Sequence, residues 1–212
     1  MKSTEIVITN QGSGMEEALN AVEAFAASTH LNGKSAIRFR LLAEETISLM
    51  TSITGEVEAD FWLENDENTG VYSIHLETLT KMTAEKRKAL LSVSSTGENV
   101  STRGFMGKIQ GIFERFMESY ANEGIPEYYT SGLILAQSGS PTASEEADPN
   151  ANAIIWSMNQ YKSSLLHKKD KSSSALEEWD ALEKSILANA ADEVKVGIRS
   201  GRVELTISKK FS

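Results

Sequence analysis

Hydrophobic and polar residues alternate most regularly between residues 56 and 80. Apolar residues stand at every second position from Val57 to Leu63, and residues 71–80 repeat the same period of two. The intervening residues 65–70 are polar and end in glycine, a composition typical of a turn. The pattern predicts a β-hairpin in which Trp62 lies on the polar side. We expect the helices predicted within residues 153–190 to cover Trp62, with a partner contact as the alternative.

Four shorter segments also have the character of strands. Residues 5–9 are rich in β-branched side chains and precede a glycine-containing turn, and residues 132–136 form a short apolar run. Residues 193–199 and 202–209 alternate on either side of Ser200-Gly201. A two-residue turn of this kind predicts a second hairpin near the end of the chain.

Apolar residues recur at helical spacing in most of the remaining chain. The predicted helices are residues 15–29, 34–53, 84–93, 104–120, 153–166 and 174–190. Ser174 with Glu177 three residues later fits a capping box at the start of the last one. Residues 137–150 consist of turn formers and charges, which predicts a mobile loop.

Strands and helices therefore alternate in a mixed order. This order predicts an α+β fold, a two-layer α/β sandwich in which a mixed β-sheet has helices packed on one face. We expect one domain over residues 1–212, with a helical insertion at residues 153–190 before the final hairpin.

The helix at residues 34–53 has acidic residues within an apolar pattern. Steps of four, three and four residues from Ile37 pass Leu41, Glu44 and Ser48, which predicts a carboxylate and a hydroxyl on the apolar stripe. A carboxylate on a buried stripe must find partners or shift its pKa, because an unpaired buried charge is costly. Glu44 is therefore a candidate for chemistry or ligand contact.

A structural role for the same residues is the alternative. Glu44 and Glu45 would then flank a core helix and form ion pairs with Arg38, Arg40 or Lys81.

Composition narrows the classes of partner. The chain of 212 residues has a formal net charge of -9, and an acidic surface repels phosphate groups, so we expect neither nucleic acid nor membrane as a partner. It has no cysteine, which excludes disulfides and thiolate chemistry. No apolar run is long enough to cross a bilayer, and we expect a cytoplasmic protein. The three histidines are scattered, which favours structural roles over a metal site.

Residues 41–50 resemble the motif that opens the nucleotide pocket in the GHKL (Bergerat-fold) ATPases, especially the anti-sigma-factor serine kinases and histidine-kinase-like ATPase domains. The family motif is a helix with a glutamate and, four residues later, an asparagine that holds magnesium. Glu44 matches the glutamate, and Ser48 occupies the asparagine position. The resemblance implies that Glu44 is catalytic and that Ser48 is a weak magnesium ligand, with ATP as the cofactor.

Two further segments extend the resemblance. In the family, a glycine-rich segment precedes a helix whose N-terminus faces the triphosphate, and residues 101–109 imply that Arg103, Gly104, Gly107 and Lys108 lie against phosphate. The family also has an aspartate and a Gly-x-Gly turn that read adenine. Residues 74–82 contain no glycine, and Glu77 is the nearest counterpart of that aspartate.

The resemblance covers residues 1–120 and, more weakly, 190–212. It implies a regulatory GHKL-like protein with a degenerate nucleotide site that acts by binding another protein. One alternative is an active serine kinase or ATPase that uses ATP and magnesium. A second is a structural oligomerisation module, for example a homodimer formed through the helices of residues 153–190.

Overall fold

The computed structural model describes residues 1–9, 12–54, 58–79, 133–135, 154–168, 173–199 and 202–211. The helices predicted at residues 84–93 and 104–120, and the loop predicted at residues 137–150, lie outside these ranges.

In the part of the chain that the structure describes, seven strands form one sheet in the order β1-β2-β3-β7-β6-β5-β4. They are β1 (Ile6–Thr9), β2 (Glu58–Asp66), β3 (Val71–Leu79), β4 (Leu133–Leu135), β5 (Ile154–Ser157), β6 (Glu193–Arg199) and β7 (Arg202–Lys210). Both predicted hairpins are confirmed, since β2 pairs with β3 and β6 pairs with β7. Each pairing between neighbouring strands is antiparallel, which differs from the mixed sheet that the sequence predicts.

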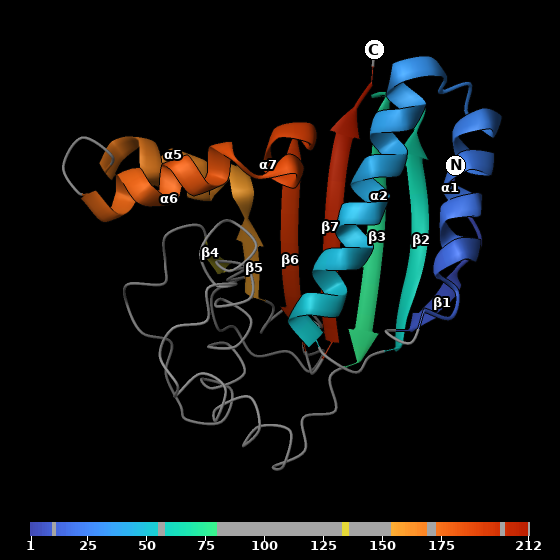
Figure 1. Ribbon diagram of the computed structural model, residues 1–212, viewed down its shortest axis with the longest axis horizontal. Helices are drawn as coiled ribbons and strands as arrows, with labels where there is room; N and C mark the ends of the chain where they lie inside the picture. The colour runs from blue at the N-terminus through green and yellow to red at the C-terminus, as the bar shows by residue number, and fades with distance from the viewer. Residues whose placement is uncertain are drawn as a thin grey trace, which may run out of the picture.

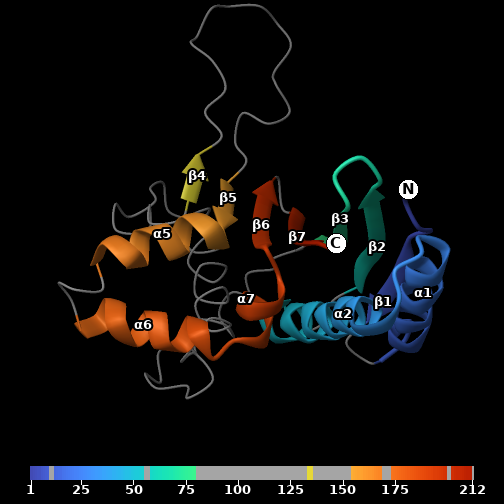
Figure 2. The ribbon, with the colours of Figure 1, turned by 90° about the horizontal axis from the view of Figure 1, so that it is seen from above.

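Helices form the second layer. They are α1 (Met15–Ser28), α2 (Gly33–Thr54), α5 (Met158–Lys168), α6 (Ser173–Glu183) and α7 (Ile186–Ala190). Helix α2 packs against β3 and β7, and Figure 2 shows α2 and α7 along the same face of the sheet. Helices α5 and α6 pack on each other and extend past β5 and β4, at the edge of the sheet opposite β1 (Figure 1). The described part of the chain is therefore an α+β fold.

The strand register assigns every sheet residue to one of two faces. Phe61, Leu76 and Leu205 occupy neighbouring positions on β2, β3 and β7, and all three are buried beneath the helices. Because side chains alternate along a strand, the residues immediately before and after each of these three point away from α2. We call this opposite side the distal face. Its described residues on the three central strands are Glu58, Asp60, Trp62, Glu64, Asp66, Val71, Ser73, His75, Glu77, Arg202, Glu204, Thr206, Ser208 and Lys210.

An aromatic cluster joins the two layers. Phe39 of α2 lies with its ring centroid 5.4 Å from Tyr72 of β3, 6.0 Å from Phe211 and 6.4 Å from Phe25 of α1. The Tyr72 hydroxyl donates a hydrogen bond to the carbonyl of Thr29, at the end of α1. Aromatic pairs at these distances add to the stabilisation from buried area. The cluster fixes which side of α2 faces the sheet.

The segment predicted as a helix from residue 153 is a strand followed by a helix. Ile154–Ser157 pairs with β6, and α5 begins at Met158. The Glu193 carboxylate accepts hydrogen bonds from the Ser157 hydroxyl (2.9 Å) and from the backbone N–H of Asn159 (3.2 Å). A carboxylate at a helix N-terminus satisfies N–H groups that have no partner within the helix. This contact from β6 marks where the strand ends and the helix starts.

The last predicted helix is also divided. Residues 173–183 form α6, and Ser185 then caps the separate helix α7 by accepting a hydrogen bond from the backbone N–H of Ala188.

Candidate functional site

The predicted apolar stripe on α2 is wrong. The side chain of Ile37 is 70% exposed, and Glu44 and Ser48 are exposed as well. The buried side of the helix consists of Phe39, Leu42, Ala43, Thr46 and Ile47. The carboxylate of Glu44 therefore does not point between the helices and the sheet.

Glu44 instead belongs to an exposed ion-pair network. Its carboxylate accepts a hydrogen bond from Nε of Arg40 (3.0 Å), and Arg40 also pairs with Glu23 of α1. The hydrogen bond from Arg40 to Glu44 raises the pKa of the Arg40 guanidinium. This is the structural alternative for Glu44, and it links α1 to α2.

The structure does not bring Glu77 together with Glu44. Glu77 lies on the distal face of β3 and pairs with Arg202 of β7, so the sheet separates it from α2. Thr78 is the neighbouring residue on the helix side, and its buried hydroxyl donates to the carbonyl of Glu58 (2.9 Å). Glu77 therefore does not lie where the resemblance implies an acid that contacts adenine, in one site with Glu44.

Of the other residues of the predicted nucleotide site, the structure describes only Ser48. Ser48 lies one helical turn after Glu44 on the exposed side of α2. Arg103, Gly104, Gly107 and Lys108 lie outside the described residues. In the described ranges, no three His, Asp or Glu side chains are grouped as metal ligands. Binding of ATP and magnesium stays a prediction.

The distal face contains a different cluster, built around Trp62 and His75. These residues are direct partners across β2 and β3, and their rings stack with centroids 4.8 Å apart and planes 4° apart. The ammonium of Lys2 lies 4.8 Å from the centroid of the Trp62 ring. We refer to Lys2, Trp62, Glu64, His75 and Glu204 as the Trp62 cluster.

Carboxylates hold both rings of this cluster in place. The indole N–H of Trp62 donates to Glu64 (3.1 Å), and Nδ1 of His75 lies 3.3 Å from the carboxylate of Glu204. Nε2 of His75 is buried without a hydrogen bond and lies 3.6 Å from Glu64. The hydrogen bond with His75 lowers the pKa of Glu204, although partial burial opposes this shift. The cluster thus combines two flat rings with negative charge.

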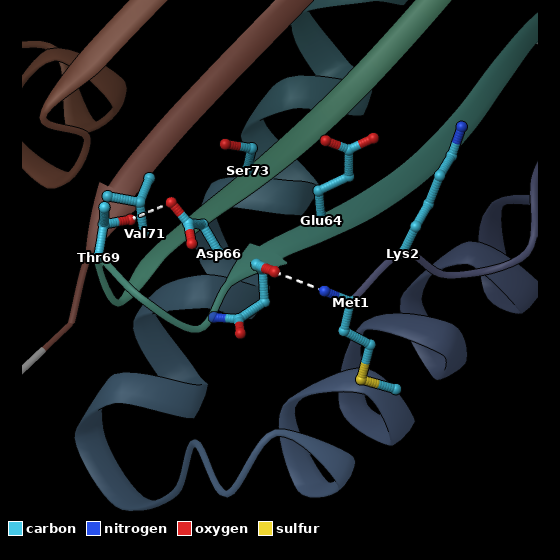
Figure 3. Close-up of a pocket in the computed structure, with 8 residues that line it drawn as sticks. Met1, Lys2, Glu64, Asp66, Thr69, Val71 and Ser73 are labelled. Carbon is cyan, nitrogen blue, oxygen red and sulfur yellow. Dashed lines mark hydrogen bonds between the residues drawn. The ribbon is translucent and has the colours of Figure 1, made fainter.

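A pocket of about 510 Å³ adjoins the Trp62 cluster. Figure 3 shows Lys2, Glu64 and Ser73 along the hairpin, with Asp66 and Thr69 at its turn. Thr69 donates a hydrogen bond to Asp66 (2.7 Å), and the hydrogen bonds to Asp66 lower the pKa of its carboxylate. Lys2 and Glu64 belong to both features, so the pocket continues the surface of the cluster.

Of the helices within residues 153–190, α5 packs on β5 and β6, α6 packs on α5, and α7 packs on α2. Among the described residues, Trp62 contacts Lys2, Glu64 and His75, so the predicted cover by the helices of residues 153–190 is wrong.

The stacking of His75 on Trp62 was not predicted, although the sequence contains a signal for it. The hairpin turn pairs Asp66 with Val71, and counting back four positions on each strand pairs Trp62 with His75. No local pattern predicts the contact of Glu204 with His75, because β7 follows β3 by more than a hundred residues in the sequence.

None of the described helices has the length and apolar character needed to cross a bilayer. Comparisons of the chain with models of protein families, with curated proteins and with solved structures give no match.

Proposed function

We propose that this protein is a regulatory, GHKL-like domain with a degenerate nucleotide site that acts by binding another protein through its distal face. The order strand, helix, helix, hairpin from β1 to β3 agrees with the order that the family resemblance implies. The α+β architecture, with α2 packed on an extended sheet, agrees with it as well.

The observation that supports protein binding most directly is the Trp62 cluster. Trp62 is only half-buried although it is large and mostly apolar, and it lies among charged side chains on the distal face. Tryptophan with a polar surround is typical of residues that contribute strongly to protein interfaces. A surface of this composition is suited to a transient partner.

The ion pairs that Glu44 and Glu77 form support a regulatory role rather than a catalytic one. The carboxylate of Glu44 is paired with Arg40, and that of Glu77 is paired with Arg202 on the other side of the sheet. A general base must reach the proton that it removes, and an ion pair competes with that role.

Addition of MgATP is expected to leave the melting temperature unchanged within about 1 °C. A functional site with a Kd one hundredth of the ligand concentration would stabilise the protein by roughly 2.7 kcal/mol. For a chain of this size, that corresponds to a shift of about 5–10 °C. Differential scanning fluorimetry with about 5 mM MgATP distinguishes the two cases, with MgCl₂ alone as the control. A shift of several degrees would refute the degenerate site and favour the kinase or ATPase alternative.

Loss of the Trp62 ring is expected to abolish partner binding. Wild-type protein, Trp62→Ala and Ile37→Ala would be immobilised and exposed to an extract of the source cells. The Ile37 side chain is exposed on the opposite layer, which makes it a matched apolar control. We expect a protein that the wild type and Ile37→Ala retain equally and that Trp62→Ala retains about tenfold less, in the range of a hot-spot residue. Equal retention by all three would contradict the assignment of the distal face.

A further inference from the structure

The distal residues of β2 form an acidic strip interrupted by Trp62. They are Glu58, Asp60, Trp62, Glu64 and Asp66, each two residues from the next. Alternate residues of a strand are separated by about 6.6 Å, so the strip offers four carboxylates and one ring at regular intervals. Asp60 also lies directly opposite Glu77, and like charges at opposed positions destabilise a sheet. Arg202 pairs with Glu77 and offsets part of that repulsion, and a positively charged ligand beside Asp60 would offset more of it.

A cation already occupies the centre of this strip. The Lys2 ammonium lies against the Trp62 ring and also pairs with Glu5 (3.1 Å). Its position is set by the backbone, because the N–H of Ser3 donates to Leu63 (2.9 Å) and that of Asn65 donates to Met1 (2.8 Å). Lys2 comes from the outer side of β2 and His75 from the β3 side, so the two flank the ring from opposite directions.

Lys2 is not held tightly in this position. Its side chain is 48% exposed, and an exposed lysine pair contributes little stability. An arginine would bind the same place better, since its planar guanidinium stacks on an aromatic ring and donates two parallel hydrogen bonds to a carboxylate. Glu64, whose carboxylate already accepts from the Trp62 indole, is the nearest candidate for such a pair.

From these observations we infer that the distal face binds an extended, arginine-containing segment of a partner protein, and that Lys2 occupies the central arginine position in the unbound protein. The inference rests on the proposed function and specifies the chemistry of the partner. An extended segment with basic residues at every second position has the same repeat as the acidic strip. The pocket beside Lys2 and Glu64 gives one of its side chains space near Asp66.

The test uses a fluorescein-labelled peptide in which four arginines alternate with serines, capped at both ends, and fluorescence anisotropy as the readout. We expect Trp62→Ala to weaken binding about fivefold or more, because a cation–π contact is lost. Trp62→Phe should restore most of the affinity, since it keeps a ring. Circular dichroism and the melting temperature of each variant verify that it is folded.

Two charge-matched variants separate a specific site from general attraction. Lys2→Ala should bind the peptide roughly threefold more tightly than wild type, since the internal cation no longer competes. Lys34→Ala removes the same charge from an exposed position on α2 and should change the affinity less than about 1.5-fold, because distant charges are screened by salt. A peptide with glutamate in place of arginine should not bind.

Equal effects of Lys2→Ala and Lys34→Ala, or unchanged binding by Trp62→Ala, would overturn the inference. Tighter binding of the glutamate peptide would overturn it as well. Such results would not contradict the proposed function if MgATP leaves the melting temperature unchanged and if Trp62→Ala still fails to retain the protein that the wild type captures from the extract. A large shift with MgATP would instead refute the proposed function, whatever the peptide does.

Discussion

Replacement of Phe39 by alanine is expected to lower the free energy of unfolding by about 3–5 kcal/mol, the usual cost of removing a buried phenylalanine ring. Phe39 is fully buried and contacts Phe25, Tyr72 and Phe211, which come from α1, β3 and the residue after β7. The cavity would therefore weaken contacts among segments that are far apart in sequence. Since domains of this kind are stable by only about 5–15 kcal/mol, the loss should be evident as a lower urea midpoint.

Ile37→Ala is the matched control on the same helix. It removes an apolar side chain of which 70% is exposed, so we expect a change within about 0.5 kcal/mol. The two variants together test the orientation of α2. If Ile37→Ala were the more destabilising one, the helix would be rotated and Glu44 would lie toward the sheet.

The orientation of α2 shows why the sequence alone was insufficient there. The helix has apolar residues on two sides, with Ile37 and Leu41 on one and Phe39, Leu42 and Ile47 on the other. Periodicity cannot choose between two such stripes. Tyr72 and Phe211 decide the choice by packing on Phe39, and neither is near α2 in sequence. The prediction for Glu44 failed for this reason.

The first hairpin was predictable because its determinants are local. Strict alternation and a polar turn define both strands and both faces, and they place Trp62 on the side away from the core. The pairing of Glu77 with Arg202 and of His75 with Glu204 requires β7 to lie beside β3. That strand order is a property of the whole chain. The residues of the Trp62 cluster on the hairpin could therefore be predicted from the sequence, whereas Glu204 of β7 could not.

The segment before α5 was mispredicted for a related reason. Ile155 and Trp156 fit a buried strand or a buried helix equally well when the run is short. Pairing with β6 and the contact of Glu193 with Ser157 select the strand. Tertiary hydrogen bonds here outweigh the local preference.

The turn between β1 and α1 provides the second large effect on stability. Gly14 precedes the first residue of α1 with φ of 76°, and its carbonyl accepts a hydrogen bond from the N–H of Ala18 (2.8 Å). A Cβ atom added at this position would lie 2.1 Å from the backbone oxygen of Val7 in β1. The close approach of the two backbones requires glycine.

Gly14→Ala is expected to destabilise the protein by about 2–5 kcal/mol, because a left-handed conformation is costly with a side chain and the overlap must be relieved by moving β1. Gly12→Ala is the control, since Gly12 also has positive φ (87°) but its added Cβ would have no atom within 4 Å. Its cost should be limited to roughly 1–2 kcal/mol from the backbone conformation alone. Urea unfolding of both variants measures the difference, and equal losses would show that α1 does not approach β1 as closely as the structure places it.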